Sequence, residues 1–130
     1  MTASETSIRG AYVRACYWMV LPAIVSHEGT HAAAAKLLGI PIVEFRWSPT
    51  RFPAVFLDGG GIAPWRIVLA WLAPTIVGIA AGLAFVVVVG SVPPTASGAV
   101  AILYWIVYSM PSRDDLRPLL AAVGVLKILD

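Results

Sequence analysis

Long apolar stretches, separated by short polar breaks, make up most of this chain. A transmembrane helix needs about 20 apolar residues to cross a bilayer core of about 30 Å. Three stretches meet that length, and we expect membrane spans at about residues 12–38, 65–89 and 98–128, the last with a break at 111–115. Residues 1–10 are polar, and we expect a frayed terminus there. The pattern therefore predicts an all-α integral membrane protein with a core of three transmembrane helices, forming one domain over residues 1–130.

The periodicity changes between the first two stretches. Val43, Phe45 and Trp47 alternate with polar residues, which is typical of a half-buried strand. A turn at 48–50 and a second strand at 52–57 would come next, although Pro53 restricts that second strand to an edge or irregular position. We expect a short, membrane-associated insert resembling a β-hairpin after the first helix.

Composition supports a membrane environment. Apolar residues make up 59% of the chain and charged residues 12%, against about 25% charged in a typical soluble domain. The stretch from 67 to 112 carries no charged residue at all. These properties exclude a disordered tail, a nucleic-acid-binding arm and an ordinary water-soluble enzyme.

The basic residues flank the apolar stretches instead of forming a patch, so we expect no nucleic-acid partner. Four of them surround the first connection, at Lys36, Arg46, Arg51 and Arg66, and others lie after the break at 111–115. Loops rich in Lys and Arg stay on the cytoplasmic side of a membrane. We therefore expect a multi-pass protein of the cell membrane, with its first loop and C-terminus cytoplasmic and its N-terminus outside.

The chain has two histidines, His27 and His31, and they lie four residues apart in the sequence His-Glu-Gly-Thr-His. On a helix this spacing places both imidazoles on one face, where they can bind one zinc ion. Glu28 lies on a neighbouring face, where it can act as a catalytic base toward a water molecule. Three ionisable residues within five positions of an apolar stretch also favour a functional site over a structural one.

Two other interpretations of this motif stay open. The histidines could be interfacial residues at a helix end, with Glu28 as a solvated neighbour. Alternatively, Arg9 and Arg14, the apolar residues 15–25 and the small residues 32–35 could form a secretory signal peptide whose cleavage would remove the motif.

A catalytic zinc site uses three protein ligands, so two histidines leave one ligand missing. Cys16 is far from the motif along the helix, and we expect a packed free thiol there. The remaining acids lie at the chain ends or in the first loop, except for Asp114 and Asp115. We expect one of this pair to be the third ligand, although Asp115, with Pro118 after it, also fits a helix N-cap.

The motif and its flank, HEGTHAAAAKLLGIP, resemble the first motif of the site-2 protease family, which are intramembrane zinc metalloproteases. The resemblance extends over residues 15 to 120 and implies a three-helix catalytic core with zinc inside the bilayer, near its cytoplasmic side. By this resemblance His27 and His31 are zinc ligands, Glu28 is the catalytic base, and an Asp of the third span completes the site. The strand at 43–47 resembles the family's β element, which is thought to pair with an unwound substrate.

The chain departs from the family pattern in its later motifs. Tyr108 stands where family members often have Asn, no Gly follows Asp115, and the spacing from Pro111 to Asp115 is one residue shorter. Residues 73–77 carry Pro but lack the Asn of the family's second motif. The choice between the two aspartates stays open, and we favour Asp115 because Pro-Ser-x-x-Asp looks like a variant of compact relatives.

The sequence thus predicts an intramembrane zinc endopeptidase that hydrolyses peptide bonds within or next to transmembrane segments. Its expected cofactor is Zn²⁺, and its expected partners are a transmembrane protein substrate and the lipid bilayer. The alternative is a zinc-binding membrane protein without proteolytic activity, a scaffold or partner. Glu28 distinguishes the two, because a protein that only binds metal has no need of a general base.

Overall fold

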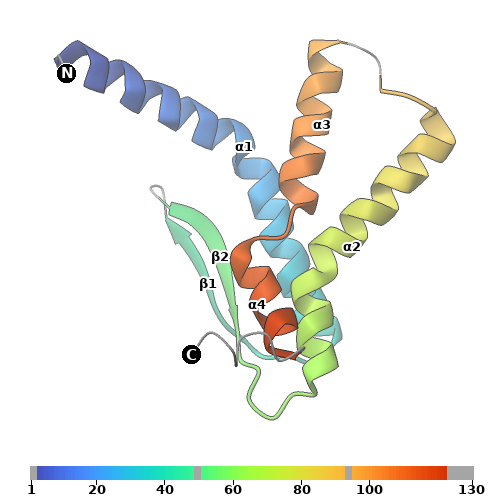
Figure 1. Ribbon diagram of the computed structural model, residues 1–130. Coiled ribbons are helices and arrows are strands. Elements are labelled where there is room, and N and C mark those ends of the chain that lie inside the picture. The colour runs from blue at the N-terminus through green and yellow to red at the C-terminus, as the bar shows by residue number, and fades with distance from the viewer. Residues whose placement is uncertain (1–2, 49–50, 93–94, 123–130) are drawn as a thin grey trace.

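The computed structural model describes residues 3–48, 51–92 and 95–122. Within these ranges the chain forms helices and one antiparallel hairpin (Figure 1). In chain order the elements are α1 (Ala3–Leu37), β1 (Ile42–Ser48), β2 (Arg51–Leu57), α2 (Pro64–Val89), α3 (Ala96–Ser109) and α4 (Arg113–Ala122).

The expected core of three transmembrane helices is wrong. Among the described residues, α2 is the one helix long and apolar enough to cross a membrane, with a mean hydropathy of 2.5 over its most apolar window. Helix α1 is longer, but His27, Glu28 and His31 interrupt its apolar sequence. Helix α3 has 14 residues and is therefore about 21 Å long, short of a bilayer core of about 30 Å.

The predicted third span is two separate helices. The chain leaves helical geometry after Ser109, and α4 starts at Arg113 with three charged residues in succession. Pro111 explains the break, because proline disfavours helical geometry in the residue before it. The end of that predicted span, residues 123–128, lies outside the described residues.

Helix α1 also differs from the expectation at its start, because it is helical from Ala3 instead of frayed over residues 1–10. Its end agrees with the sequence: Gly39 adopts a positive φ of 69°, which a residue with a side chain rarely adopts. The amide of Ile40 then donates to the carbonyl of Ala35 at 2.8 Å. After this helix end, the chain reverses direction and enters the hairpin.

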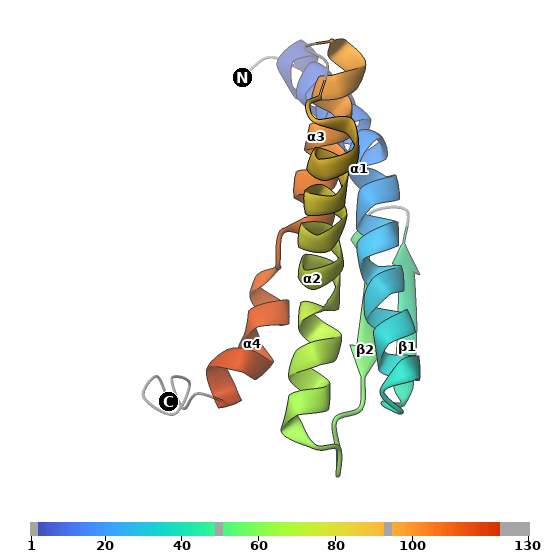
Figure 2. The same ribbon diagram turned by 90° about the vertical axis from the view of Figure 1, so that its right-hand side faces the viewer.

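The hairpin runs alongside the C-terminal part of α1 (Figure 2). Phe45 lies opposite Val55 in the register, and β2 makes most of the hairpin's contact with α1. Pro53 and Val55 are buried in β2. Residues 49–50 of the expected turn lie outside the described residues.

Helices α2 and α3 pack closely through two glycines of α2. A Cβ added at Gly78 would overlap Ser109 Oγ, and one at Gly82 would lie 2.8 Å from the Trp105 ring. The Trp105 indole donates to the carbonyl of Gly78 at 2.8 Å, and Thr75 Oγ1 donates to the carbonyl of Ser109 at 2.9 Å. This contact fixes the end of α3, and with it the start of α4, beside the middle of α1 (Figure 1).

Candidate metal centre

The two histidines of α1 face the same interior position. The Nε2 atoms of His27 and His31 lie 3.1 Å apart. His31 has no exposed surface and His27 is 6% exposed. The four-residue spacing therefore does bring both imidazoles together on one helix face, as the sequence indicated.

Backbone carbonyls of two other helices orient both rings. His27 Nδ1 lies 2.6 Å from the carbonyl oxygen of Tyr108 in α3, and His31 Nδ1 lies 2.9 Å from that of Ala70 in α2. A carbonyl only accepts, so each Nδ1 carries a proton and donates it. That arrangement leaves Nε2 as the ligand atom, which is how metal-binding histidines are held in proteins. Every residue has a main-chain carbonyl, so the sequence could not identify which two carbonyls would hold the histidines.

Asp115 completes the cluster from the start of α4. Its Oδ2 lies 3.3 Å from His27 Nε2, and its Oδ1 lies 3.1 Å from His31 Nε2. The residue is 3% exposed. Three ligand-type side chains, from α1 and α4, thus converge on one buried position.

The capping role expected as an alternative for Asp115 belongs to Ser112. Ser112 Oγ accepts from the amide of Asp115 at 3.2 Å, while the amide of Ser112 donates to Asp115 Oδ2. This reciprocal pair is a capping box, in which the cap and the acid three residues later satisfy each other's amides. Asp115 therefore fixes its own helix start and faces the histidines with the same carboxylate. The Ser-x-x-Asp spacing was a sequence signal for choosing between the aspartates.

The structure separates Asp114 from the histidines. Its side chain is 77% exposed and lies 3.5 Å from Arg117, one turn along α4. Such an exposed ion pair contributes little to the stability of the fold. Of the two candidate aspartates, only Asp115 lies at the cluster.

Glu28 lies beside the histidines and contacts the hairpin. Its Oε2 accepts from the amide of Val55 in β2 at 2.9 Å, and a carboxylate oxygen lies within 4.8 Å of the ligand-type nitrogens of His27 and His31. The sequence drew attention to the strand at 43–47, but the strand next to Glu28 is β2.

The pKa values of the two carboxylates of the site shift in opposite directions. Burial raises the pKa of Glu28, and the amide of Val55 only partly offsets this effect. Burial acts in the same direction on Asp115, but the close Nε2 atoms of both histidines, which donate to the carboxylate when the imidazoles are protonated, and the hydrogen bond from the amide of Ser112 outweigh it and hold the pKa of Asp115 below its usual range. Asp115 is therefore a carboxylate near neutral pH, as a metal ligand must be.

For His27, burial lowers the pKa of the imidazole. When His27 is protonated, its Nε2–H donates to Asp115 and its Nδ1–H to the carbonyl of Tyr108, and these hydrogen bonds outweigh burial, so the pKa of His27 is raised overall. Zinc would bind in competition with protons at this site, because a ligating imidazole must be neutral.

The donor set fits a zinc ion. Two imidazole nitrogens and a carboxylate are ligands that catalytic zinc uses, at about 2.0–2.2 Å. Tetrahedral ligands at that distance lie about 3.3–3.6 Å from one another. The observed separations of 3.1 to 3.3 Å among His27, His31 and Asp115 are close to this spacing.

No protein-family model, curated protein or solved structure matches this chain. Function is therefore inferred from the geometry of the chain's own residues. The strongest part of that geometry is the cluster of two histidines and one aspartate, with a glutamate beside it.

Proposed function

We propose that this protein is a zinc endopeptidase that cleaves polypeptides within or next to a membrane. One observation carries the proposal: the ligand atoms of His27, His31 and Asp115 converge to within 3.1–3.3 Å in a buried position, and Glu28 lies next to them. The resemblance of the histidine motif to the site-2 protease family supports the same activity.

His27, His31 and Asp115 would hold the metal. Zinc bound in such a donor set supplies Lewis-acid chemistry, which activates water and polarises a carbonyl group. Glu28 is placed to take a proton from the attacking water and to return it to the leaving amine. The peptide is thereby hydrolysed to a carboxylate and an amine.

We infer the depth of the site from its distance to the start of α2. Ala70, whose carbonyl holds His31, comes six residues after Pro64 at the start of α2, which is about 9 Å along the helix axis. With α2 across a membrane, the histidines would lie inside the apolar layer near that end. Arg66 and Lys36 lie at the same end, so we assign it to the cytoplasmic side of the cell membrane.

A substrate cleaved at this depth is a polypeptide segment in the membrane. Its peptide bonds are protected by helical hydrogen bonds, so the segment must be extended before a water molecule can attack. Strand β2 lies beside Glu28, and a strand edge is a suitable surface for an extended peptide. We therefore assign substrate pairing to the β2 side of the hairpin.

The test compares the zinc-loaded full chain with its Glu28→Gln variant on a panel of single-span substrates in proteoliposomes. Loss of a general base costs about 10²- to 10⁴-fold in rate, so Glu28→Gln should lose cleavage to that extent and keep its zinc. Glu44→Gln is the matched control, because Glu44 is exposed and pairs with Arg46 on the hairpin. Zinc content is read by elemental analysis.

The outcomes separate the proposed enzyme from its alternative. A wild-type protein that binds no zinc contradicts the proposal. A protein that binds zinc but cleaves no better than Glu28→Gln is the non-proteolytic zinc-binding protein.

A further inference from the structure

The hairpin holds Glu28 through a main-chain hydrogen bond. The amide of Val55 in β2 donates to Glu28 Oε2 at 2.9 Å. Opposite residues of two antiparallel strands either bond each other or both turn their amides outward. Because the single amide hydrogen of Val55 is bonded to Glu28, the pair of Val55 with Phe45 is of the outward kind. The amide of Val55 therefore belongs to the edge of β2 that faces away from β1, and α1 contacts that edge at Glu28.

A peptide that paired with this edge of β2 would need the same amide. A strand is added to a sheet edge through main-chain hydrogen bonds, in which outward amides donate to carbonyls of the added strand. Pro53, two residues earlier in β2, has no amide hydrogen to offer instead. Glu28 and a substrate carbonyl would therefore compete for one N–H group, that of Val55.

The hydrogen bond also restrains Glu28 as a base. A bond from an amide to a carboxylate is charge-assisted and stronger than a bond between neutral groups. It directs Oε2 of Glu28 toward β2, whereas a general base must come within about 2.6–3.2 Å of the group whose proton it takes. Release of the amide would free this oxygen to accept a proton.

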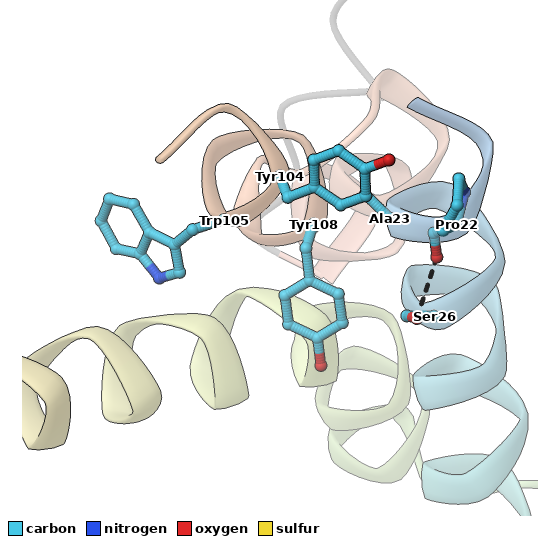
Figure 3. A pocket seen from close by; sticks show the side chains of 6 residues that line it. All are labelled: Pro22, Ala23, Ser26, Tyr104, Trp105 and Tyr108. Carbon is cyan, nitrogen blue, oxygen red and sulfur yellow. Dashed lines mark hydrogen bonds between the residues drawn. The ribbon is translucent and has the colours of Figure 1, made fainter. Parts of the chain in front are cut away.

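The hairpin is better placed to move than α1. On the opposite side of α1, Tyr104 and Tyr108 of α3 lie against residues 22–26 around a groove of about 270 Å³ (Figure 3). The hairpin, in contrast, is joined to α1 and α2 by loops that contain Gly39 and Gly61, both with positive φ. Loop residues that absorb changes in φ and ψ serve as hinges.

We propose that the Val55 amide and Glu28 form a latch: an extended substrate segment that pairs with β2 takes the amide and thereby releases Glu28 to act as the base. The inference rests on the proposed peptidase function and adds its regulation. A segment that stays helical has its carbonyls bonded internally, so it cannot take the amide and Glu28 stays held. The latch thus couples cleavage to the unwinding of the substrate.

The latch is tested first without zinc and without cleavage, by NMR measurement of hydrogen exchange at the Val55 amide in the full chain in detergent. Exchange should be about 10-fold faster or more in Glu28→Ala, because the amide loses a charged acceptor. Glu28→Gln keeps an acceptor oxygen and should show a smaller increase. Glu44→Ala is the matched control, because Glu44 is exposed and pairs with Arg46. Equal exchange in the wild type and Glu28→Ala would overturn the latch whether or not the protein is a peptidase.

A locked hairpin tests the coupling to cleavage. Phe52 of β2 stacks on Tyr17 of α1, with ring centroids 5.2 Å apart. In a Cys16→Ser background, Tyr17→Cys and Phe52→Cys are combined, and the two thiols are joined by a short reducible cross-linker. The locked protein should keep its zinc and lose cleavage of single-span substrates, and reduction should restore cleavage. The two single variants, treated in the same way, are the controls. Cleavage by the locked protein at the wild-type rate would remove the latch and leave the peptidase standing.

A loosened hairpin should have the opposite effect on a peptide too short to pair with β2, such as a blocked dipeptide. Phe52→Ala removes the ring stack on Tyr17 and should raise the rate of dipeptide cleavage about 2- to 10-fold, which is the contribution of such an aromatic pair to the closed position. Phe56→Ala is the control, because Phe56 lies in the same strand and contacts Arg46 of the hairpin. A Phe52→Ala protein that cleaves the dipeptide no faster than the wild type contradicts the latch.

Discussion

Replacing Asp115 with Asn is the sharpest test of the metal centre. The change removes the negative charge that lies 3.1 and 3.3 Å from the two histidine nitrogens. It keeps a side-chain oxygen that can accept from the amide of Ser112, so the start of α4 should survive. Asp114→Asn is the matched control, because Asp114 lies in the same first turn but is 77% exposed. Both variants lose the same favourable interaction with the helix dipole.

The expected loss can be estimated from zinc binding. Removing a group that only supports a metal ligand costs about 10- to 100-fold in affinity, so removing the charge of Asp115 itself should cost at least about 100-fold. At zinc 1,000 times above the dissociation constant, binding stabilises the folded protein by about 4.1 kcal/mol. A 100-fold weaker site retains about 1.4 kcal/mol under the same conditions. Zinc-induced stabilisation should therefore fall by about 2.7 kcal/mol.

The assay is chelator competition for zinc, together with thermal unfolding in detergent with and without the metal. Asp114→Asn should match the wild type in both measurements. Asp115 is not the third ligand if Asp115→Asn keeps wild-type zinc affinity, or if Asp114→Asn loses as much affinity. In the first case the third ligand lies elsewhere, and in the second the loss reflects the helix dipole.

Two further variants test the packing that supports the site. Gly78→Ala should destabilise the protein by about 1–3 kcal/mol in thermal unfolding, because its Cβ would overlap Ser109. Gly10→Ala is the control and should stabilise the protein slightly, because a Cβ at Gly10 meets nothing within 4 Å. A Gly78→Ala variant as stable as the wild type would contradict the close packing of α2 and α3. Tyr108→Phe removes the 2.8 Å hydroxyl contact with Thr30 and should cost about 0.5–1.5 kcal/mol. Combined with Thr30→Val it should cost less than the sum of the two single changes, whereas full additivity would show that these hydroxyls do not act as a pair.

The third predicted span shows where sequence reasoning failed. Apolar composition from 98 onward indicated one long membrane helix with an interruption. The structure ends α3 at Ser109 and starts α4 at Arg113. This division places Asp115 against α1, where a continuous helix would have carried it further along its own axis. The error in the fold and the assembly of the site thus have the same origin, the break around Pro111.

Most residues of the site could be predicted from local sequence patterns. The histidine pair depends only on helical periodicity, so the sequence placed His27 and His31 on one face of α1. The third ligand was narrowed to two aspartates by elimination. The choice between them depended on a hydrogen bond between Ser112 and Asp115 that fixes which side chain turns inward.

By itself, the sequence determined the features that depend on local chemistry: the apolar helix α2, the hairpin, the end of α1 near residue 38 and the histidine motif. Only the tertiary structure decided which elements meet. The carbonyls of Tyr108 and Ala70 orient the two histidines, and the amide of Val55 holds Glu28. The physical reason is that nearly every residue carries the same main-chain donor and acceptor. Their hydrogen-bond partners therefore depend on how the elements pack, which the residue types do not specify.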